Sequence, residues 1–150
     1  MDGGTLLLIS LGTNSGGPGK LAEAIDALQN LFGEVVTTPP EETAPLDGNG
    51  PNYFNSLALA QTTLAPKEVK QRLRHIEAVL GRNRSTPDIV AIDLDLLLYG
   101  NLVDASLKLP SPDLTECSFC LQPAAKLAPD FIHPTLGASL ATLARQRKTT

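Results

Sequence analysis

The sequence predicts an α+β fold of the split βαβ type, an antiparallel sheet with helices packed mainly on one face and the other face partly open. Two observations lead to this prediction. Apolar runs and helical stripes follow one another in the order strand, helix, strand, strand, helix, strand, helix. At 150 residues, of which 42% are hydrophobic, the chain can build one core, so we expect a single domain over residues 1–150.

The first strand and helix are marked by an apolar run and a proline. The run from Leu6 to Leu11 predicts a strand, and the turn-forming residues 12–14 end it where backbone or ligand can approach closely. Pro18 opens a helix that Gly33 ends. Its apolar stripe consists of Leu21, Ile25, Leu28 and Leu31.

Two further strands flank a long loop. A short strand passes through residues 35–36, and residues 39–51 form a loop rich in Pro, Gly, Asn and acids. Loops of this length in small domains tend to be functional. Residues 53–62 return to a strand pattern in which Tyr53 and Asn55 point to the same side.

A second long helix begins at Pro66 and ends at Gly81. Its apolar stripe consists of Val69, Leu73, Ile76 and Leu80, and its basic face of Lys67, Lys70, Arg72 and Arg74. Glu77 lies near the polar edge of this helix, where an ordinary surface carboxylate is the alternative to a functional role. A short loop over residues 82–88 follows.

The C-terminal third contains weaker signals. Residues 107–109 predict a weak strand, and residues 110–113 introduce a third helical region. Residues 136–145 predict a short surface helix. The apolar residues of the third helical region are Phe119, Leu121 and Leu127.

The most informative segment is the apolar run from Val90 to Tyr99, which contains Asp93 and Asp95. Side chains alternate across a strand, so both carboxylates project from one face. Because adjacent carboxylates repel each other and resist desolvation, they predict a cationic partner, above all one or two Mg²⁺ ions carrying a polyphosphate. A solvated edge strand with an acidic face is the alternative. The apolar residues expected to fill the other face are Val90, Ile92, Leu94, Leu96 and Leu98.

Two arginines precede this strand. Arg82 and Arg84 are two residues apart in an extended segment, and a guanidinium fork matches phosphate oxygens. They therefore predict phosphate contacts beside the metal, with a solvated helix end that interacts with the helix dipole as the alternative.

Aromatic and amide side chains predict a flat ligand. A ring can stack on Tyr53 while the amide of Asn55 offers a donor and an acceptor to its edge, and Phe119 could supply a second face. Packing in the core is the alternative for each aromatic residue.

The composition excludes some classes of protein. A net charge of −4 and a pI near 5.1 argue against a nucleic-acid binder. The first residues lack a positive region, and residues 6–9 are too few for a signal peptide or a membrane span. We therefore expect a cytoplasmic monomer that binds neither nucleic acid nor membrane.

Two cysteines lie three residues apart, Cys117 and Cys120. A zinc site would need two more ligands, and His75 and His133 are the only histidines. Two reduced thiols packed on a helix are therefore favoured over a metal or redox site.

Several short motifs occur in a characteristic order. They are Leu11-Gly12-Thr13-Asn14, Thr43-Ala44-Pro45-Leu46, Pro51-Asn52-Tyr53-Phe54-Asn55, Gly81-Arg82-Asn83-Arg84, Ile92-Asp93-Leu94-Asp95-Leu96-Leu97-Leu98-Tyr99-Gly100, Pro110-Ser111-Pro112-Asp113 and Phe119-Cys120-Leu121-Gln122-Pro123. Over nearly the whole chain this set resembles the 6-hydroxymethyl-7,8-dihydropterin pyrophosphokinase family of folate biosynthesis.

The resemblance implies a ferredoxin-like α+β fold and transfer of the terminal pyrophosphoryl group of ATP to the pterin hydroxymethyl oxygen, with release of AMP. ATP and a reduced pterin would be the partners. Asp93 and Asp95 would hold two Mg²⁺ ions and, with Arg82 and Arg84, carry catalysis. The implied pterin contacts are Thr43, Ala44, Leu46, Tyr53, Asn55 and Phe119. The implied nucleotide contacts are Arg74, Glu77, Arg82, Arg84 and Leu96.

The chain departs from the family pattern on the phosphate side. The loop over residues 85–90 is shorter, Val90 stands at the position of an arginine, Ser111 at that of a histidine and Cys117 at that of a second arginine. Lys108 is our candidate to replace one of these cations. The alternative function is a pterin-binding homologue with weakened or lost catalysis. A metal-dependent sugar transferase is less favoured, since such enzymes need a larger nucleotide-binding domain.

Overall fold

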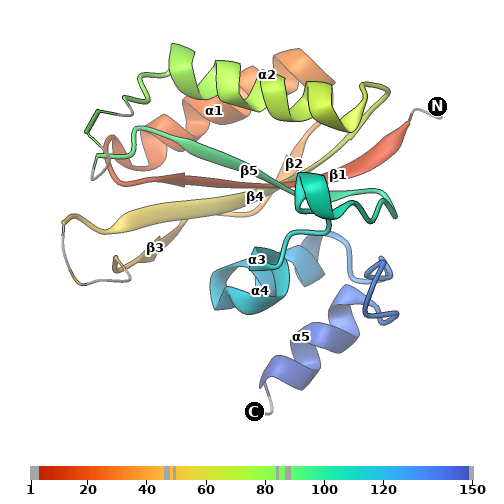
Figure 1. Cartoon of the computed structure of the whole chain (residues 1–150). Helices are drawn as coiled ribbons and strands as arrows, with labels where there is room; N and C mark the ends of the chain where they lie inside the picture. Colours follow the sequence, from red (N-terminus) through yellow and green to blue (C-terminus); the bar gives the residue numbers. More distant parts are fainter. Residues whose placement is uncertain (1–3, 46–47, 49, 84, 87–88, 149–150) are drawn as a thin grey trace.

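An antiparallel sheet forms the centre of the molecule (Figure 1). The computed structural model describes residues 4–45, 48, 50–83, 85–86 and 89–148. Along the sheet the strands follow the order β2 (Val36–Thr37), β4 (Tyr53–Thr62), β1 (Thr5–Thr13) and β5 (Asp93–Tyr99), and β3 (Glu41–Thr43) also pairs with β4. All these pairings are antiparallel, which confirms the α+β class.

The two long helices cover one face of the sheet, as the apolar stripes predict (Figure 1). They are α1 (Gly17–Phe32) and α2 (Pro66–Val79). Their buried residues join the sheet in one apolar core, which stabilises the arrangement by removing these side chains from water. The helical members of this core include Leu21, Ala24, Leu28, Val69, Leu73 and Ile76.

Short helices cover only part of the other face (Figure 1). They are α3 (Asp113–Glu116), α4 (Ser118–Leu127) and α5 (Leu140–Lys148), and the 3₁₀ helix η1 (Ala105–Leu107) precedes them. A second apolar cluster lies beneath them, and the rest of this face stays open at a cavity. Among the described residues, no helix has both the length and the apolar character that crossing a membrane requires.

Several expected elements differ from those in the structure. The turn expected at residues 12–14 begins later, because Gly12 and Thr13 still pair with β4. The weak strand over 107–109 is a 3₁₀ turn followed by a single bridge between Asp104 and Leu109. The last helix begins at Leu140, and since Leu140 is fully buried this helix packs on the second cluster. The loop over 39–51 also contains β3, which the sequence did not predict.

A β-bulge changes the face on which Leu98 lies. The pairing of β1 with β5 shifts between Leu8 and Ile9, so that Leu97 is inserted between the partners of these two residues. Leu97 and Leu98 then both join the second apolar cluster, whereas Leu94 and Leu96 join the first. Strict alternation therefore holds only up to Leu96, and the assignment of Leu98 to the Leu94 face was wrong. The strand also begins at Asp93 and not at residue 90.

Candidate active site

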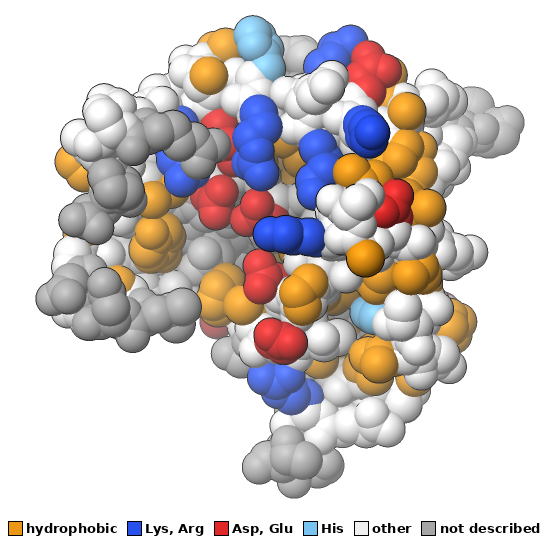
Figure 2. All heavy atoms as spheres, viewed as in Figure 1, with side chains coloured by type: hydrophobic (Ala, Val, Ile, Leu, Met, Phe, Trp, Pro, Cys, Tyr) orange, Lys and Arg blue, Asp and Glu red, His pale blue; other side chains and the backbone are white. Residues whose placement is uncertain are grey.

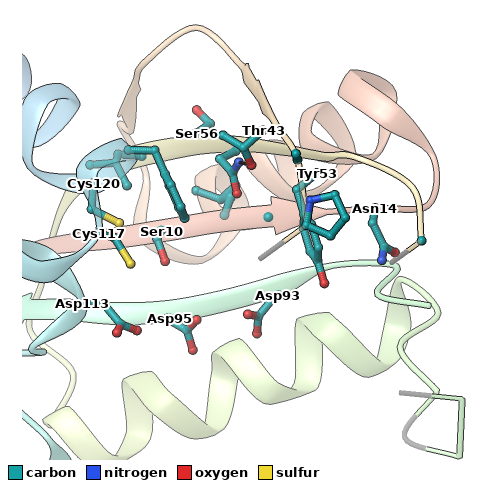
Figure 3. A pocket seen from close by; sticks show the side chains of 18 residues that line it. Ser10, Asn14, Thr43, Tyr53, Ser56, Asp93, Asp95, Asp113, Cys117 and Cys120 are labelled. Carbon is teal, nitrogen blue, oxygen red and sulfur yellow. Dashed lines mark hydrogen bonds between the residues drawn. The ribbon is translucent and has the colours of Figure 1, made fainter. Parts of the chain in front are cut away.

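The main cavity lies between the open face of the sheet and the α3–α4 segment (Figure 3). Its volume of about 520 Å³ is within the range of small-molecule sites. Strands β1, β4 and β5 supply the floor, and the residues after β3 supply one rim. The lining includes Ser10, Gly12, Asn14, Thr43, Ala44, Pro45, Tyr53, Asn55, Asp93, Asp95, Asp113, Cys117, Phe119 and Cys120.

The residues predicted to contact a flat ring meet in this cavity. Tyr53, Asn55 and Phe119 all line it, together with Thr43 and Ala44. Asn55 Nδ2 donates to Thr43 Oγ1 at 2.8 Å, which fixes the orientation of the amide. The structure thus joins five of the six predicted pterin contacts, and the sixth, residue 46, lies outside the described residues.

Gly12 keeps the floor of the cavity open. A Cβ atom at this position would lie 3.2 Å from Asn55 Oδ1 and 4.0 Å from Tyr53 Cδ2. A side chain at this position would therefore crowd the Asn55 amide and come into van der Waals contact with the Tyr53 ring. Gly12 was expected to allow close approach of backbone or ligand in a turn. It lies within β1, and the neighbouring atoms belong to the side chains of Asn55 and Tyr53.

The carboxylates of Asp93 and Asp95 line the same cavity, beside Asp113 (Figure 3). The strand that carries them is at the edge of the sheet, as the solvated alternative assumed, and the Asp93 side chain is 42% exposed. The Asp95 side chain is more enclosed than that of Asp93. Burial, followed by repulsion from Asp93, raises the pKa of Asp95 to about 7.

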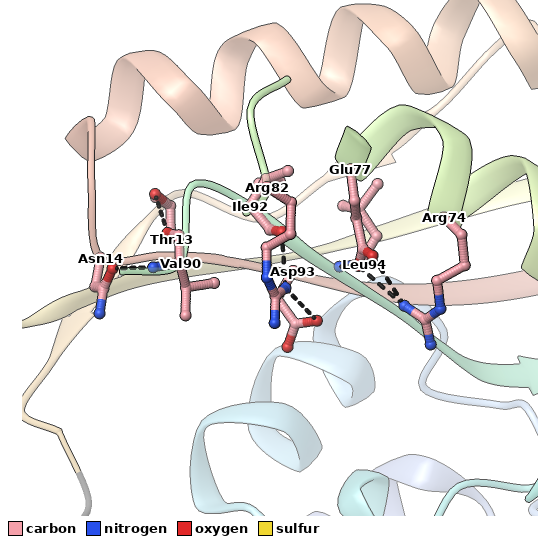
Figure 4. A network of polar contacts seen from close by, with 9 residues as sticks. All are labelled: Thr13, Asn14, Arg74, Glu77, Arg82, Val90, Ile92, Asp93 and Leu94. Atoms are coloured by element: carbon pink, nitrogen blue, oxygen red, sulfur yellow. Dashed lines mark hydrogen bonds and ion pairs between the residues drawn. The ribbon is translucent and has the colours of Figure 1, made fainter. Parts of the chain in front are cut away.

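Arg82 contacts Asp93 from the side of the preceding loop (Figure 4). Its Nη1 donates to Ile92 O at 3.1 Å and to Asp93 Oδ1 at 3.4 Å, and the side chain is only 15% exposed. Arg82 therefore fixes the start of β5 and partly offsets the charge of Asp93. The second predicted arginine, residue 84, lies outside the described residues.

Glu77 ties α2 to β5 (Figure 4). Its side chain is 1% exposed, and its Oε2 accepts from the Leu94 N–H at 2.8 Å. Both of its carboxylate oxygens accept from Arg74 Nη1 at 3.0 Å. The alternative of an ordinary surface carboxylate is wrong, because the edge strand leaves the Leu94 N–H in need of an acceptor and Glu77 supplies it. Glu77 is not among the residues that line the cavities.

A second cavity of about 300 Å³ adjoins the first along β5. Asp95 and Asp113 line both cavities, so the two spaces share a wall. Figure 2 shows Lys and Arg side chains grouped beside acidic ones on this face. The second cavity brings together three predicted nucleotide contacts, Arg74, Leu96 and Lys108, with the further residues Lys70, Leu73, Leu94, Ser106, Ser111 and Asp113.

Lys108 is held in an unusual backbone conformation. Among the described residues it is the one non-glycine with positive φ, at 57°, where it ends η1. Lys70 Nζ donates to the neighbouring Leu107 O at 2.7 Å and so ties this turn to α2. The turn thereby carries the Lys108 side chain to the second cavity.

Val90, which the resemblance implies stands in place of an arginine, has a structural role (Figure 4). Its N–H donates to Asn14 Oδ1 at 2.7 Å, and its carbonyl accepts from Asn14 N at 3.0 Å and from Thr13 Oγ1 at 3.3 Å. These bonds fasten the end of the loop to the end of β1. The side chain is buried and carries no charge toward either cavity.

Asp113, Cys117 and Cys120 are among the lining residues that were not predicted as site residues from the sequence. Their place depends on how the α3–α4 segment folds over the sheet, which local patterns do not encode. The only available signal was the Cys-x-x-Cys spacing itself, and it did not indicate a cavity.

Comparison with known proteins identifies the family of this chain. A model described as 7,8-dihydro-6-hydroxymethylpterin-pyrophosphokinase (HPPK) matches residues 8–129. The chain is 32% identical over 133 residues to the 2-amino-4-hydroxy-6-hydroxymethyldihydropteridine pyrophosphokinase of Haemophilus influenzae, covering 84% of this chain and 83% of that protein. It is 31% identical over 142 residues to the Pneumocystis carinii folic acid synthesis protein fol1, covering 89% of this chain.

Some relatives are much longer than this chain. It spans 19% of the Pneumocystis protein and 51% of the pyrophosphokinase of Synechocystis sp.. The Plasmodium falciparum HPPK-DHPS crystal structure matches with a TM-score of 0.69 at 11% identity, over 97% of this chain and 43% of that one, and supports the fold. Because the family model matches well over half of the residues, including the strand with Asp93 and Asp95, the chain belongs to the 7,8-dihydro-6-hydroxymethylpterin-pyrophosphokinase family.

Proposed function

We propose that this chain transfers the pyrophosphoryl group of ATP to the hydroxymethyl oxygen of 6-hydroxymethyl-7,8-dihydropterin, giving AMP and the pterin diphosphate in folate biosynthesis. One observation carries the proposal: a cavity with aromatic and amide side chains adjoins a cationic cavity, and Asp95 stands in the wall between them. Such an arrangement can hold a ring and a polyphosphate with their reacting groups side by side.

The main cavity fits the acceptor. A bicyclic ring can stack between Tyr53 and Phe119, while Asn55 meets its polar edge. Since Asn55 Nδ2 already donates to Thr43, the Oδ1 atom is the part of the amide best placed to accept from a ring N–H. The backbone near Ala44 offers further polar groups at the rim.

The second cavity fits the phosphates. Arg74 and Lys108 line it, and Arg82 lies beside Asp93 at the start of the same strand. These cations can neutralise phosphate charge, and Arg84 of the preceding loop is proposed to join them. Lys108 would supply part of the charge that Val90, Ser111 and Cys117 do not.

The donor set also fits Mg²⁺. Asp93 and Asp95 present two carboxylates to one cavity, and oxygen is the ligand that Mg²⁺ prefers. Within the described part of the chain, no three His, Cys, Asp or Glu side chains form a metal site by themselves. ATP oxygens and water would therefore complete the shell, which is usual for Mg²⁺. When bound, the ions would withdraw charge from the phosphates.

The residues of the chain then act by position and charge. Tyr53, Asn55 and Phe119 would hold the acceptor hydroxyl toward Asp95, and Arg74, Arg82 and Lys108 would stabilise the charge on the transferred group. Transfer of this type needs little covalent help from the protein, so no covalent intermediate is required.

The test is the nucleotide product. The wild-type chain with ATP, Mg²⁺ and the reduced pterin is expected to form AMP, and not ADP, with one pterin diphosphate for each AMP. Asp95→Asn should lower kcat at least about 100-fold, because metal-bound carboxylates support several kcal/mol of transition-state stabilisation. Asp130→Asn, an exposed acid outside both cavities, is the matched control.

Two outcomes would overturn the proposal. ADP as the product would indicate a different phosphoryl transfer. Pterin binding without AMP above background would indicate a binding protein that has lost catalysis.

A further inference from the structure

Cys117 and Cys120 lie in the wall of the main cavity, one on each side of Phe119 in the sequence (Figure 3). Neither residue has a role in the proposed transfer. Both are free thiols, Cys117 half-buried and Cys120 2% exposed. Figure 3 shows their sulfur atoms facing each other at the end of the cavity opposite Tyr53.

The backbone brings the two thiols together. Cys117 is the extended residue between α3 and α4, with φ −91° and ψ 120°, and Cys120 lies in the first turn of α4. The Cys120 N–H donates to Cys117 O at 3.0 Å, a turn that brings the two Cα atoms within about 7 Å. A disulfide can close at this Cα separation with little backbone movement.

A metal site is disfavoured at the same place. Tetrahedral zinc needs four ligands, and within the described part of the chain no third His, Cys, Asp or Glu side chain completes a site with these two sulfurs. The Asp113 carboxylate lines the cavity too, but it does not form such a group with them. The pair is therefore better suited to a bond between its own sulfur atoms.

We propose that Cys117 and Cys120 form a reversible disulfide in the wall of the main cavity, and that a bound pterin prevents its formation. The oxidant is a low-molecular-weight disulfide. Cys117 Sγ attacks one of its sulfurs as a thiolate and releases one small thiol. Cys120 Sγ then attacks the mixed disulfide at Cys117 and releases the second. Two electrons and two protons pass from the protein to two small thiols.

The effect of pterin on disulfide formation follows from the route by which the oxidant reaches Cys117. This part of the proposal rests on the proposed function. Cys120 is enclosed, and Cys117 presents its surface to the cavity, so the oxidant arrives through the space that the ring would fill. A pterin between Tyr53 and Phe119 covers that approach. Because only empty cavities admit the oxidant, the rate of disulfide formation should fall in proportion to the fraction of cavities that pterin occupies.

The protonation of the thiols sets the speed of the exchange. Burial, and then the neighbouring Asp113, raises the pKa of Cys117, and burial raises the pKa of Cys120 to about 12. Since only the thiolate reacts, oxidation is slow at neutral pH and accelerates as the pH rises. The disulfide should therefore form during sustained and not during brief exposure to the oxidant.

The first experiment tests the disulfide itself. The folded wild-type chain is incubated with bis(2-hydroxyethyl) disulfide, and its mass and free thiols are measured. We expect loss of two hydrogens and of both thiols, reversed by dithiothreitol. Neither Cys117→Ser nor Cys120→Ser should lose two hydrogens. Cys120→Ser should stop at a mixed disulfide on Cys117, whereas Cys117→Ser should keep its enclosed thiol reduced. A wild-type chain that retains free thiols or carries two small adducts would overturn the proposal.

The second experiment tests the coupling. With 6-hydroxymethyl-7,8-dihydropterin at about ten times its Kd, about a tenth of the sites stay empty, so disulfide formation should slow about tenfold. Asn55→Ala, with weakened pterin binding, should lose this protection. Pterin affinity is measured separately by calorimetry. Binding without protection overturns the coupling, whereas absence of binding contradicts the proposed function and leaves the first experiment to decide the disulfide.

Discussion

Asp95 is a carboxyl group whose pKa is raised to about 7, by burial first and then by Asp93. In metal-free protein the folded state therefore holds a proton that the unfolded chain loses above a pH of about 4. The folded state binds more protons across this window, so Asp95 lowers the free energy of unfolding as the pH rises from about 4 to 7, by at most about 4 kcal/mol.

Asp95→Asn should remove this pH dependence. Urea unfolding of both proteins in the presence of a chelator, at pH about 5 and about 7.5, measures it. The variant is expected to be the more stable protein at the higher pH, with a smaller difference at the lower. Equal changes with pH in both proteins would contradict the assignment, and Asp130→Asn serves as the charge control.

Glu77 is the residue whose removal should most weaken the contact between α2 and β5. Glu77→Ala leaves the Leu94 N–H without its acceptor and separates Arg74 from its partner, so we expect a loss of about 2 to 3 kcal/mol. Glu77→Gln keeps an oxygen acceptor and should lose about 1 kcal/mol less. Urea unfolding measures both.

The matched control lies on the same helix. Glu68 pairs with Arg72 at 3.1 Å, but both side chains are exposed, so Glu68→Ala should cost no more than about 0.5 kcal/mol. If Glu77→Ala cost as little as Glu68→Ala, the role of Glu77 in joining helix and strand would be wrong. The sequence did not reveal this role because burial of Glu77 depends on β5 being an edge strand.

At the level of elements, the strands and helices with strong patterns were predictable. The stripe that begins at Leu21 and the one that begins at Val69 both face the sheet. Features that depend on a partner strand were not predictable. The bulge at Leu97 arises from the pairing with β1, and β3 exists because residues 41–43 pair with the start of β4. Local sequence encodes neither partner.

The turn that anchors α5 should depend on the charge of His133. This residue is buried, and its Nδ1 accepts from the N–H groups of Thr135 at 3.3 Å and Leu136 at 3.2 Å. Burial lowers the pKa of His133, so the folded state binds fewer protons than the unfolded chain. Its contribution to the free energy of unfolding is present above a pH of about 6.5 and is lost as the pH falls through the folded-state pKa.

His133→Asn should remove this loss, because the amide oxygen can accept the same N–H groups and does not titrate. Hydrogen exchange of the amides of residues 133–140 at pH about 5 and about 7.5 measures the effect locally. The wild type is expected to lose protection at the lower pH and the variant to keep it. Equal protection in both proteins at both pH values would contradict the prediction.

At the level of the whole molecule, the site consists of two cavities that meet at Asp95 and Asp113. Much of it was predictable: Tyr53, Asn55 and Phe119 line the first, and Lys108 lines the second. Asp113 and the cysteines were missed since only the path of the chain after β5 brings them to the cavity. The sequence identified Tyr53, Asn55, Phe119 and Lys108, but it did not show that the two cavities share a wall at Asp95 and Asp113.

This division into two cavities predicts that a substitution can weaken the binding of one ligand without weakening that of the other. At 100 times its Kd, either the reduced pterin or a non-hydrolysable ATP analogue with Mg²⁺ should stabilise the wild type by about 2.7 kcal/mol and raise Tm by about 5 to 10 °C. Asn55→Ala should lose most of the pterin response and keep the nucleotide response. Lys108→Ala should keep the pterin response and lose about half of the nucleotide response or more, because loss of a charge-assisted phosphate contact reduces nucleotide affinity about tenfold or more. Alanine at position 108 replaces one non-glycine residue at positive φ with another, so backbone strain changes little.

The rise in Tm on addition of each ligand, measured by thermal unfolding of the three proteins, tests this prediction. Loss of both responses in either variant would contradict two separate cavities.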